Sequence, residues 1–295
     1  MRYLSVLAIL LTLVSCDKDI FVSVEPQMIV EGWIDADGFP VVILTESVVI
    51  EDNDYKEYSD LNKYMIKWAK VTVCDGEEEV VLTGKGTKDY FPPYIYTTTR
   101  MRGVAGKRYK LTVEYKDYYA EAETVIPEKI SLDSMAVKYC NDKDSLFYID
   151  AFFTDPLQKK NYYKFFTKVV ERDSFYLSSD MAVLDDAQFS SSNVSVAVCS
   201  GSTIYDESDR MYFGADEKVL LKFVHIDSAA YSYWDMYKDV KAFSRNPLFP
   251  YSRNLPSNIS GAYGYWFGYG STEYMVDMKQ NESVSHDTPS PLNFQ

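Results

Sequence analysis

The sequence predicts a mainly β protein in two parts, both built from short strands, with one helix in the second part. Three observations support this fold class. Apolar and polar residues alternate over short runs such as Tyr109–Tyr115, which is the period of a half-buried strand. Turn-forming pairs such as Asp75-Gly76 separate these runs. Tyrosine, which suits half-buried sheets, occurs 26 times in 295 residues.

Residues 26–127 contain a regular series of strand-like segments and turns. The predicted strands are Met28–Ile34, Val41–Thr45, Val71–Cys74, Val80–Thr83, Tyr94–Tyr96, Tyr109–Tyr115 and Tyr119–Val125. Roughly seven short strands in about 100 residues are typical of an immunoglobulin- or fibronectin-like β-sandwich. We therefore expect a first domain over residues 26–127.

Residues 128–278 form a second β-rich domain with an amphipathic helix near residues 228–244. The predicted strands are Ser134–Tyr139, Leu146–Thr154, Tyr162–Glu171, Asn193–Val198, Lys218–His225 and Tyr263–Gly270. Asp227 is the expected N-cap of the helix, and Asn246-Pro247 ends it. Apolar residues recur at helical spacing, which favours core packing: Ala229, Tyr233, Met236, Val240 and Phe243. Residues 279–295 are a polar tail.

The N-terminal segment is too short to cross a membrane. Its apolar run, Leu4–Val14, has 11 residues, whereas a spanning helix needs about 20. With Arg2 in front, the run matches a secretory signal, and its end, Leu13–Cys16, resembles the bacterial lipoprotein box. The resemblance implies a signal peptide over 1–15, lipidation of Cys16 and a tether over 16–25. A core strand ending in a buried cysteine is the alternative.

Composition and motifs argue against several functions. The net charge of −14 disfavours nucleic acid. There are two histidines and no HExxH or GxSxG motif, so we expect no enzyme, no catalytic residue, no metal site and no cofactor. The acidic segments 35–38 and 51–54 lack a full calcium loop. A carboxylate-based hydrolase stays open, as does a disulfide among Cys74, Cys140 and Cys199.

Aromatic residues give the candidate binding surface. They form two groups, Tyr94 with Tyr96, and the alternating series Tyr263, Tyr265, Phe267 and Tyr269. In a strand, this second series lies on one face, and Gly264, Trp266, Gly268 and Gly270 lie on the other. Exposed rings would suit a glycan, a peptide or a barrel rim. The alternative, which the pattern favours, is that most of these rings pack the cores.

The order of several segments resembles the Bacteroidetes outer-membrane lipoproteins catalogued as domain of unknown function 4249. The segments that carry this resemblance are Val30–Ile34, Pro40–Thr45, Ala69–Val73 with Asp75-Gly76, Tyr109–Val113, Ile126-Pro127, Asn246-Pro247 and Pro256–Ile259. Asp17-Lys18-Asp19 likewise looks like the surface-export signal of such lipoproteins.

The resemblance implies a partner. Members of this family are typically encoded beside TonB-dependent outer-membrane receptors. We therefore expect a lipid-anchored outer-membrane protein, facing the extracellular side, that works with such a receptor in nutrient uptake. The alternatives are a structural or adhesive surface protein and, less favoured, the carboxylate-based hydrolase.

Overall fold

The computed structural model describes residues 26–47, 62–141, 146–156, 159–203, 211–244 and 254–279. The strands of the first half are β1 (Met28–Asp35), β2 (Val41–Glu46), β3 (Lys70–Cys74), β4 (Glu79–Val81), β5 (Thr83–Gly86), β6 (Tyr94–Thr97), β7 (Arg108–Tyr115) and β8 (Tyr118–Val125). Those of the second half are β9 (Ser134–Asn141), β10 (Leu146–Thr154), β11 (Tyr162–Val169), β12 (Leu177–Asp185), β13 (Asn193–Val198), β14 (Phe213–Gly214), β15 (Lys218–Ile226) and β16 (Tyr263–Asp277). A short 3-10 helix (Asp186–Gln188) follows β12, and α2 (Ser228–Ser244) follows β15. The mainly β fold class is confirmed.

One eight-stranded sheet runs through both halves in the order β12-β11-β15-β16-β1-β2-β6-β5. β16 joins the halves, because its first part pairs in parallel with β1 and its second part pairs antiparallel with β15. The predicted strand ended at Gly270, but β16 continues to Asp277. The division predicted at residue 127 therefore does not separate two independent units, since a strand of the second region completes a sheet of the first.

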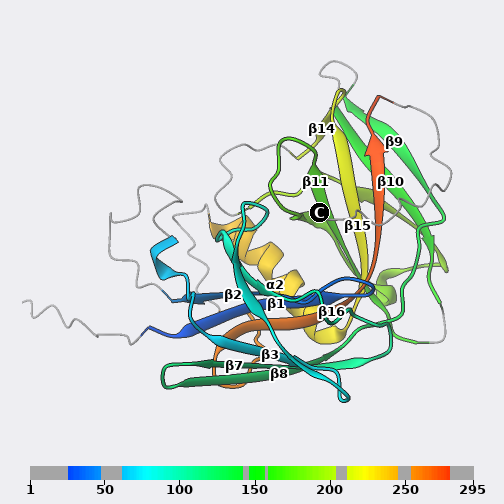
Figure 1. Ribbon diagram of the computed structural model, residues 1–295. Helices are drawn as coiled ribbons and strands as arrows, with labels where there is room; N and C mark the ends of the chain where they lie inside the picture. Colours follow the sequence, from blue (N-terminus) through cyan, green and yellow to red (C-terminus); the bar gives the residue numbers. More distant parts are fainter. Residues whose placement is uncertain are drawn as a thin grey trace, which may run out of the picture.

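The first half is a β-sandwich, as predicted. Its second sheet has the order β4-β3-β7-β8, and Figure 1 shows β3, β7 and β8 below β1 and β16. Alternate residues of β1, including Val30 and Ile34, are buried between the sheets. Trp266 of β16 is fully buried in the same core, and its Nε1 donates to the Tyr109 carbonyl at 3.1 Å.

Glycines let β16 cross the end of β8 closely. A Cβ at Gly268 would lie 2.7 Å from the Val125 carbonyl oxygen, and one at Gly270 would lie 2.6 Å from that of Pro127. Both contacts are with backbone, which cannot rotate away as a side chain could. The alternation of aromatic and glycine faces predicted from the sequence is confirmed, and the glycine face is the one that another segment approaches.

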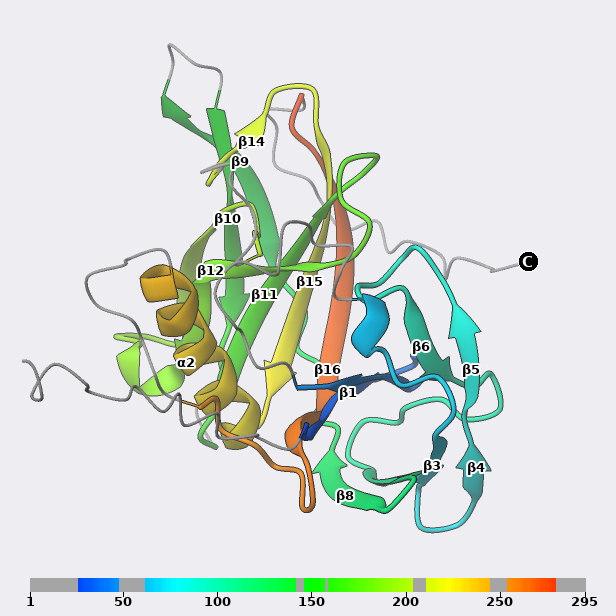
Figure 2. The same ribbon diagram turned by 90° about the vertical axis from the view of Figure 1, so that its left-hand side faces the viewer.

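The second half adds a further layer of strands. β9, β13 and β14 pair with β10 in a four-stranded sheet, which Figure 2 shows rising beside β11 and β15. The core between this sheet and β11, β15 and β16 is rich in phenylalanine, including Phe153, Phe165 and Phe223. β12 was not predicted, because its sequence, LSSDMAVLD, lacks a clear period of two.

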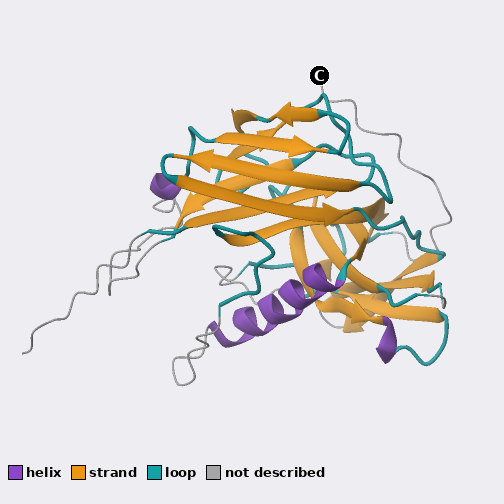
Figure 3. Cartoon of the chain, turned by 90° about the horizontal axis from the view of Figure 1, so that it is seen from below, coloured by secondary structure: helices purple, strands orange, loops and turns teal. Residues whose placement is uncertain are grey.

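α2 covers the other face of the eight-stranded sheet, and Figure 3 shows it lying alongside the strands. Asp227 caps it, accepting a hydrogen bond from the Ala230 amide at 2.8 Å, as predicted. The predicted apolar stripe is wrong, since Ala229 is exposed and the buried face is centred on Ala230, Tyr233 and Trp234. No helix among the described residues is long and apolar enough to span a membrane.

Candidate functional site

The face of the eight-stranded sheet that α2 covers buries charged side chains. Lys164 of β11 is 0% exposed and Lys222 of β15 is 6% exposed. The register of β11 and β15 places the two lysines close together. Lys164 lies opposite Val224 and Lys222 lies opposite Phe166, two positions along the same pair of strands. Burying an ammonium group costs free energy unless its charge is compensated. The surroundings of these two lysines are therefore a candidate functional site.

Lys222 is paired with Asp35, the last residue of β1. The lysine Nζ lies 2.6 Å from Oδ1 and 2.7 Å from Oδ2 of Asp35, and the two side chains are 8% and 19% exposed. The same Nζ lies 5.6 Å from the ring centre of Tyr176 and 5.7 Å from that of Tyr269. One carboxylate and two aromatic faces thus stabilise the buried charge.

Lys164 has a different set of partners. Its Nζ donates to the carbonyl of Ser179 on β12, and it lies 5.4 Å from the ring centre of Phe166 and 6.0 Å from that of Trp234. Trp234 donates from Nε1 to the hydroxyl of Tyr269 at 3.2 Å, which links the surroundings of the two lysines. We call the resulting set the buried polar cluster. It comprises Asp35, Lys164, Tyr176, Ser179, Lys222 and Tyr269.

Three atoms of the buried polar cluster are buried without a hydrogen-bond partner among the described residues. They are Oδ1 of Asp35, the hydroxyl of Tyr176 and Oγ of Ser179. Oδ1 of Asp35 contacts Lys222 as an ion pair but accepts no well-directed hydrogen bond. Buried polar atoms in folded proteins are nearly always paired, and two of these three have a charged neighbour, because Lys222 contacts Oδ1 of Asp35 and Glu273 interacts with the hydroxyl of Tyr176.

The tyrosines beside the buried polar cluster are held in their protonated form. Burial raises the pKa of Tyr176 well above its usual value, and the negative charge of Glu273 raises it further. Burial, followed by the charge of Asp35, raises the pKa of Tyr90 to about 12. These hydroxyls therefore remain hydrogen-bond donors at neutral pH, so the cluster can combine ammonium and hydroxyl donors with one carboxylate acceptor.

Glu31 adds a second buried acid on the same face of β1. Desolvation by burial raises its pKa to about 7. Burial likewise raises the pKa values of Tyr233 and Tyr265, and the charge of Glu31 adds a smaller contribution. Glu31 pairs with Tyr265 in the strand register, two positions before the Trp33–Phe267 pair. The α2-facing side of β1 therefore carries two acids, of which only Asp35 has a described cationic partner.

A model of the family described as "Domain of unknown function (DUF4249)" matches residues 17–275. The chain belongs to this family. No curated protein and no solved structure gives a match. The family resemblance that the order of segments predicted is therefore confirmed.

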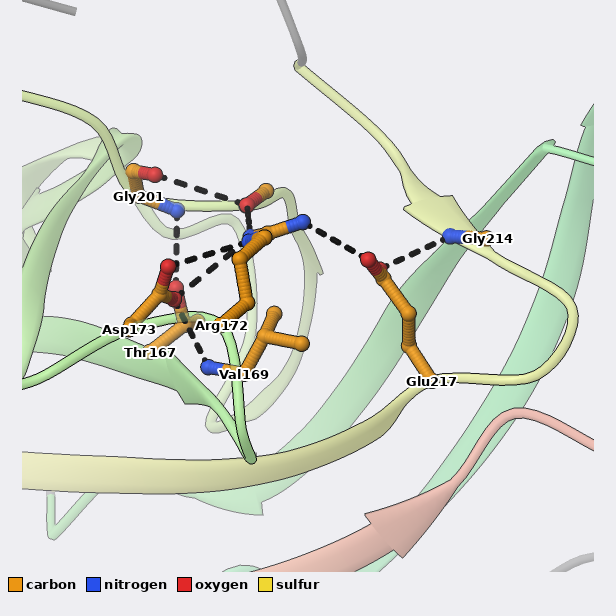
Figure 4. A network of polar contacts seen from close by, with 8 residues as sticks. Thr167, Val169, Arg172, Asp173, Gly201, Gly214 and Glu217 are labelled. Atoms are coloured by element: carbon orange, nitrogen blue, oxygen red, sulfur yellow. Dashed lines mark hydrogen bonds and ion pairs between the residues drawn. The ribbon is translucent and has the colours of Figure 1, made fainter.

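A second polar network in this DUF4249 chain is structural. Figure 4 shows Arg172 between Glu217 and Asp173. Arg172 donates to Glu217 at 2.8 Å, to Asp173 at 3.0 Å and to the hydroxyl of Ser200 at 2.8 Å. The two carboxylates also accept backbone amides, from Val169 to Asp173 and from Gly214 to Glu217. The charges and donors of this network are used within the fold, so the network stabilises turns. It is therefore a weaker candidate for a functional site than the buried polar cluster.

The predicted aromatic surface is mostly core in this DUF4249 chain. Tyr96, Tyr265, Phe267 and Tyr269 are 1–6% exposed, so these four side chains cannot form an exposed surface. Tyr94 is partly buried and donates to the Lys67 carbonyl at 3.1 Å. Only Tyr263 is exposed, at 50%. The correction has a simple cause: α2 covers this face of β16, and the pattern of β16 alone does not reveal its neighbour.

Other residues considered from the sequence have structural partners or lie outside the described ranges. His225 contacts the Glu128 carbonyl through Nδ1 at 2.8 Å, and burial lowers its pKa. Asp37 of the predicted turn pairs with Lys129 at 2.7 Å. Cys74, Cys140 and Cys199 form no disulfide with one another. Cys16, His286 and residues 51–54 lie outside the described residues.

Sequence reasoning missed the buried polar cluster. A signal was present, since Lys164 interrupts the apolar run Tyr162–Phe166 and Lys222 interrupts Val219–Val224. Lysine is almost never fully buried unless it is paired, so two lysines inside apolar strands should have prompted a search for an acid. The acid could not be named, because Asp35 is 187 positions away from Lys222.

Proposed function

We propose that this chain is a non-enzymatic, lipid-anchored protein of the outer membrane that faces the cell exterior and works with a TonB-dependent receptor in nutrient uptake. The observation that carries this proposal is the segment Leu13–Cys16, with Asp17-Lys18-Asp19 directly after it. A thiol in this position is the nucleophile that takes a diacylglycerol group, and multiple acyl chains hold a protein to a bilayer without a spanning helix.

The fold is consistent with this role. The first strand begins at Met28, only a short distance along the chain from Cys16, so the anchor would keep the sandwich beside the membrane.

Replacing the anchor residue tests the membrane part of the proposal. Cys16→Ala should leave the chain unprocessed or released from the membrane, measured by fractionation and by mass spectrometry of the N-terminus. Cys140→Ala is the matched control, because Cys140 is an exposed free thiol in the folded part, and it should remain anchored. A Cys16→Ala chain that is still acylated and membrane-bound would refute the anchor.

The receptor part of the proposal needs a separate experiment. We expect a TonB-dependent receptor to co-purify with the wild-type chain from outer membranes solubilised in mild detergent. The Cys16→Ala chain, added to the same extract, controls for association after lysis. Recovery of the wild-type chain without any receptor would contradict the partnership while leaving the anchor intact.

A further inference from the structure

One end of the N-terminal sandwich gathers exposed aromatic residues and lysines around the point where the described chain begins. The hydroxyl of Tyr118 donates to the Pro26 carbonyl at 2.6 Å, and Tyr263 pairs with Ile29 at the start of β1. Ile66 donates its amide to the Leu44 carbonyl, which brings the segment before β3 to the same end. We call this end the tether pole, formed by Pro26, Lys63, Lys67, Trp68, Lys116, Tyr118, Tyr119 and Tyr263. Figure 1 shows the start of β1 and the β7–β8 turn together at its left side.

The aromatic side chains of the tether pole are unusually open to solvent. Trp68 is 88% exposed, Tyr119 is 55% exposed and Tyr263 is 50% exposed. Trp266, by comparison, is fully buried and Trp234 is 9% exposed. Trp and Tyr combine an apolar ring with a polar tip, and membrane proteins concentrate both residues at the level of the lipid headgroups.

Charge at the tether pole differs from charge over the whole chain. The sequence carries a net charge of −14, whereas the described residues at this end of the sandwich include lysines at positions 63, 67, 70 and 116 beside the acids Glu46, Glu114 and Asp117. Lys116 lies 3.4 Å from Glu46, and Lys70 lies 2.7 Å from Glu114. The part of this pole that the structure describes therefore lacks the excess negative charge that would repel a lipid surface.

The anchor of the proposed function would hold this end against the bilayer. Ten residues, 16–25, separate Pro26 from the start of the mature chain. Their maximum reach is about 35 Å, and a flexible chain of that length spans about 17 Å on average. Short tethers give a high effective concentration, so even weak contacts of the tether pole with lipid would be populated.

We propose that the tether pole lies in the headgroup layer of the membrane that holds Cys16, with Trp68, Tyr119 and Tyr263 as its aromatic contacts. This inference rests on the lipid anchor of the proposed function. It orients the molecule, because the opposite pole, at the end of β1, then points away from the membrane. The buried polar cluster, which includes Asp35 at that end of β1, lies on the membrane-distal side.

Fluorescence quenching by brominated lipid tests the orientation. The acylated full chain is inserted into vesicles of phosphatidylethanolamine and phosphatidylglycerol that carry bromine on the acyl chains close to the headgroup. We expect strong quenching of the emission of the wild-type chain and severalfold less quenching in Trp68→Phe, whose other tryptophans lie away from the pole. Equal quenching of the two chains would overturn the proposal.

A matched control places the probe at the opposite pole. Val104 is 54% exposed, and its neighbour Gly103 bridges to Ala36 just after β1. In a Trp68→Phe background, Val104→Trp adds an exposed tryptophan far from the tether, and we expect it to remain unquenched. Quenching at Val104→Trp that matches the wild-type chain would contradict a fixed orientation.

Vesicle flotation separates failure of this inference from failure of the anchor. A chain that floats with the vesicles while Trp68 remains unquenched overturns the tether pole and leaves lipidation intact. A chain that is unacylated and does not float refutes the anchor, and the tether pole with it. If Trp68 is unquenched and a photo-crosslinker at Tyr119 captures an outer-membrane protein, the pole is a protein-docking face and the lipid assignment is wrong.

Discussion

The two faces of the eight-stranded sheet use the same alternating backbone for opposite purposes. One face packs against the two four-stranded sheets and is filled with Val, Leu, Ile, Phe and the indole of Trp266. The other face lies under α2 and holds Lys164, Lys222, Asp35 and Glu31 among aromatic rings. Strand residues alternate between these faces, so neighbouring positions in the sequence fall in very different environments.

The difference shows how a sheet can separate stability from polar chemistry. Apolar burial is nondirectional and stabilises in proportion to the area removed from water. Buried charges need specific partners, and they cost stability when a partner is lost. The apolar face is therefore suited to holding the two halves together, whereas the polar face depends on its specific ion pairs and hydrogen bonds.

Truncation on the apolar face should have the largest effect. Trp266→Ala removes a fully buried indole from the core that β16 shares with the first sandwich, and it should lower the free energy of unfolding by about 3–5 kcal/mol. Denaturant titration measures the change. Trp68→Ala is the control, since Trp68 is 88% exposed and its loss should change stability by about 0.5 kcal/mol or less. Equal effects of the two substitutions would contradict the assigned cores.

Removing the acid of the buried ion pair should come next. Asp35→Ala leaves the ammonium of Lys222 buried without its carboxylate and should cost about 3 kcal/mol of unfolding free energy. Combining Asp35→Leu with Lys222→Met replaces both charges with apolar groups and should recover most of that loss. If the double variant is as unstable as Asp35→Ala, the penalty does not come from an uncompensated charge.

Glu31 predicts a pH-dependent effect on the same face. Its pKa is raised from 4.5 to about 7, so between these values the unfolded chain ionises Glu31 while the folded chain keeps it protonated. Stability should therefore fall as pH rises through this range and level off above it, with a loss of about 2–3 kcal/mol. Glu31→Gln should remove this part of the decline, measured as the difference between variant and wild-type unfolding free energies at each pH. A difference that is constant with pH would show that Glu31 titrates normally.

An ion pair on the outer surface should matter least. Lys70 and Glu114 lie 2.7 Å apart, but their side chains are 56% and 48% exposed. A double-mutant cycle with Lys70→Ala and Glu114→Ala should give a coupling energy of about 0.5 kcal/mol, reduced further by added salt. A coupling as large as that of the Asp35–Lys222 pair would remove the contrast between buried and exposed charges.

Local pattern was enough to locate most strands of this protein. Leu146–Thr154 and Asn193–Val198 have the same bounds in the structure as in the prediction, and the helix spans Ser228–Ser244. Two of the failures were also local. β12 has no clear alternation of apolar and polar residues. The apolar stripe predicted for α2 is one residue out of phase with the buried face, because Tyr233 belongs to both and the prediction left out Trp234 and Tyr237.

The candidate site was not predictable to the same degree. Lys164 and Lys222 stand out as charges in apolar strands, but Tyr176, Ser179 and Asp35 come from segments whose neighbours depend on strand order. The alternation in β16 correctly predicted which aromatic residues share a face, but it could not predict that α2 covers that face. Periodicity tells which residues point the same way, and it does not tell what covers them.

The sequence by itself determined the fold class, most of the strands, the capped helix and the family, because each depends on residues close together in the chain or on their order along it. The tertiary structure alone decided that β16 pairs with β1 and β15, that α2 buries the aromatic face of β16, and that Asp35 meets Lys222. The physical reason is that strand pairing and burial join segments far apart in the chain. Many apolar strands have a suitable pattern, and only the packing of the whole molecule selects the pair that forms.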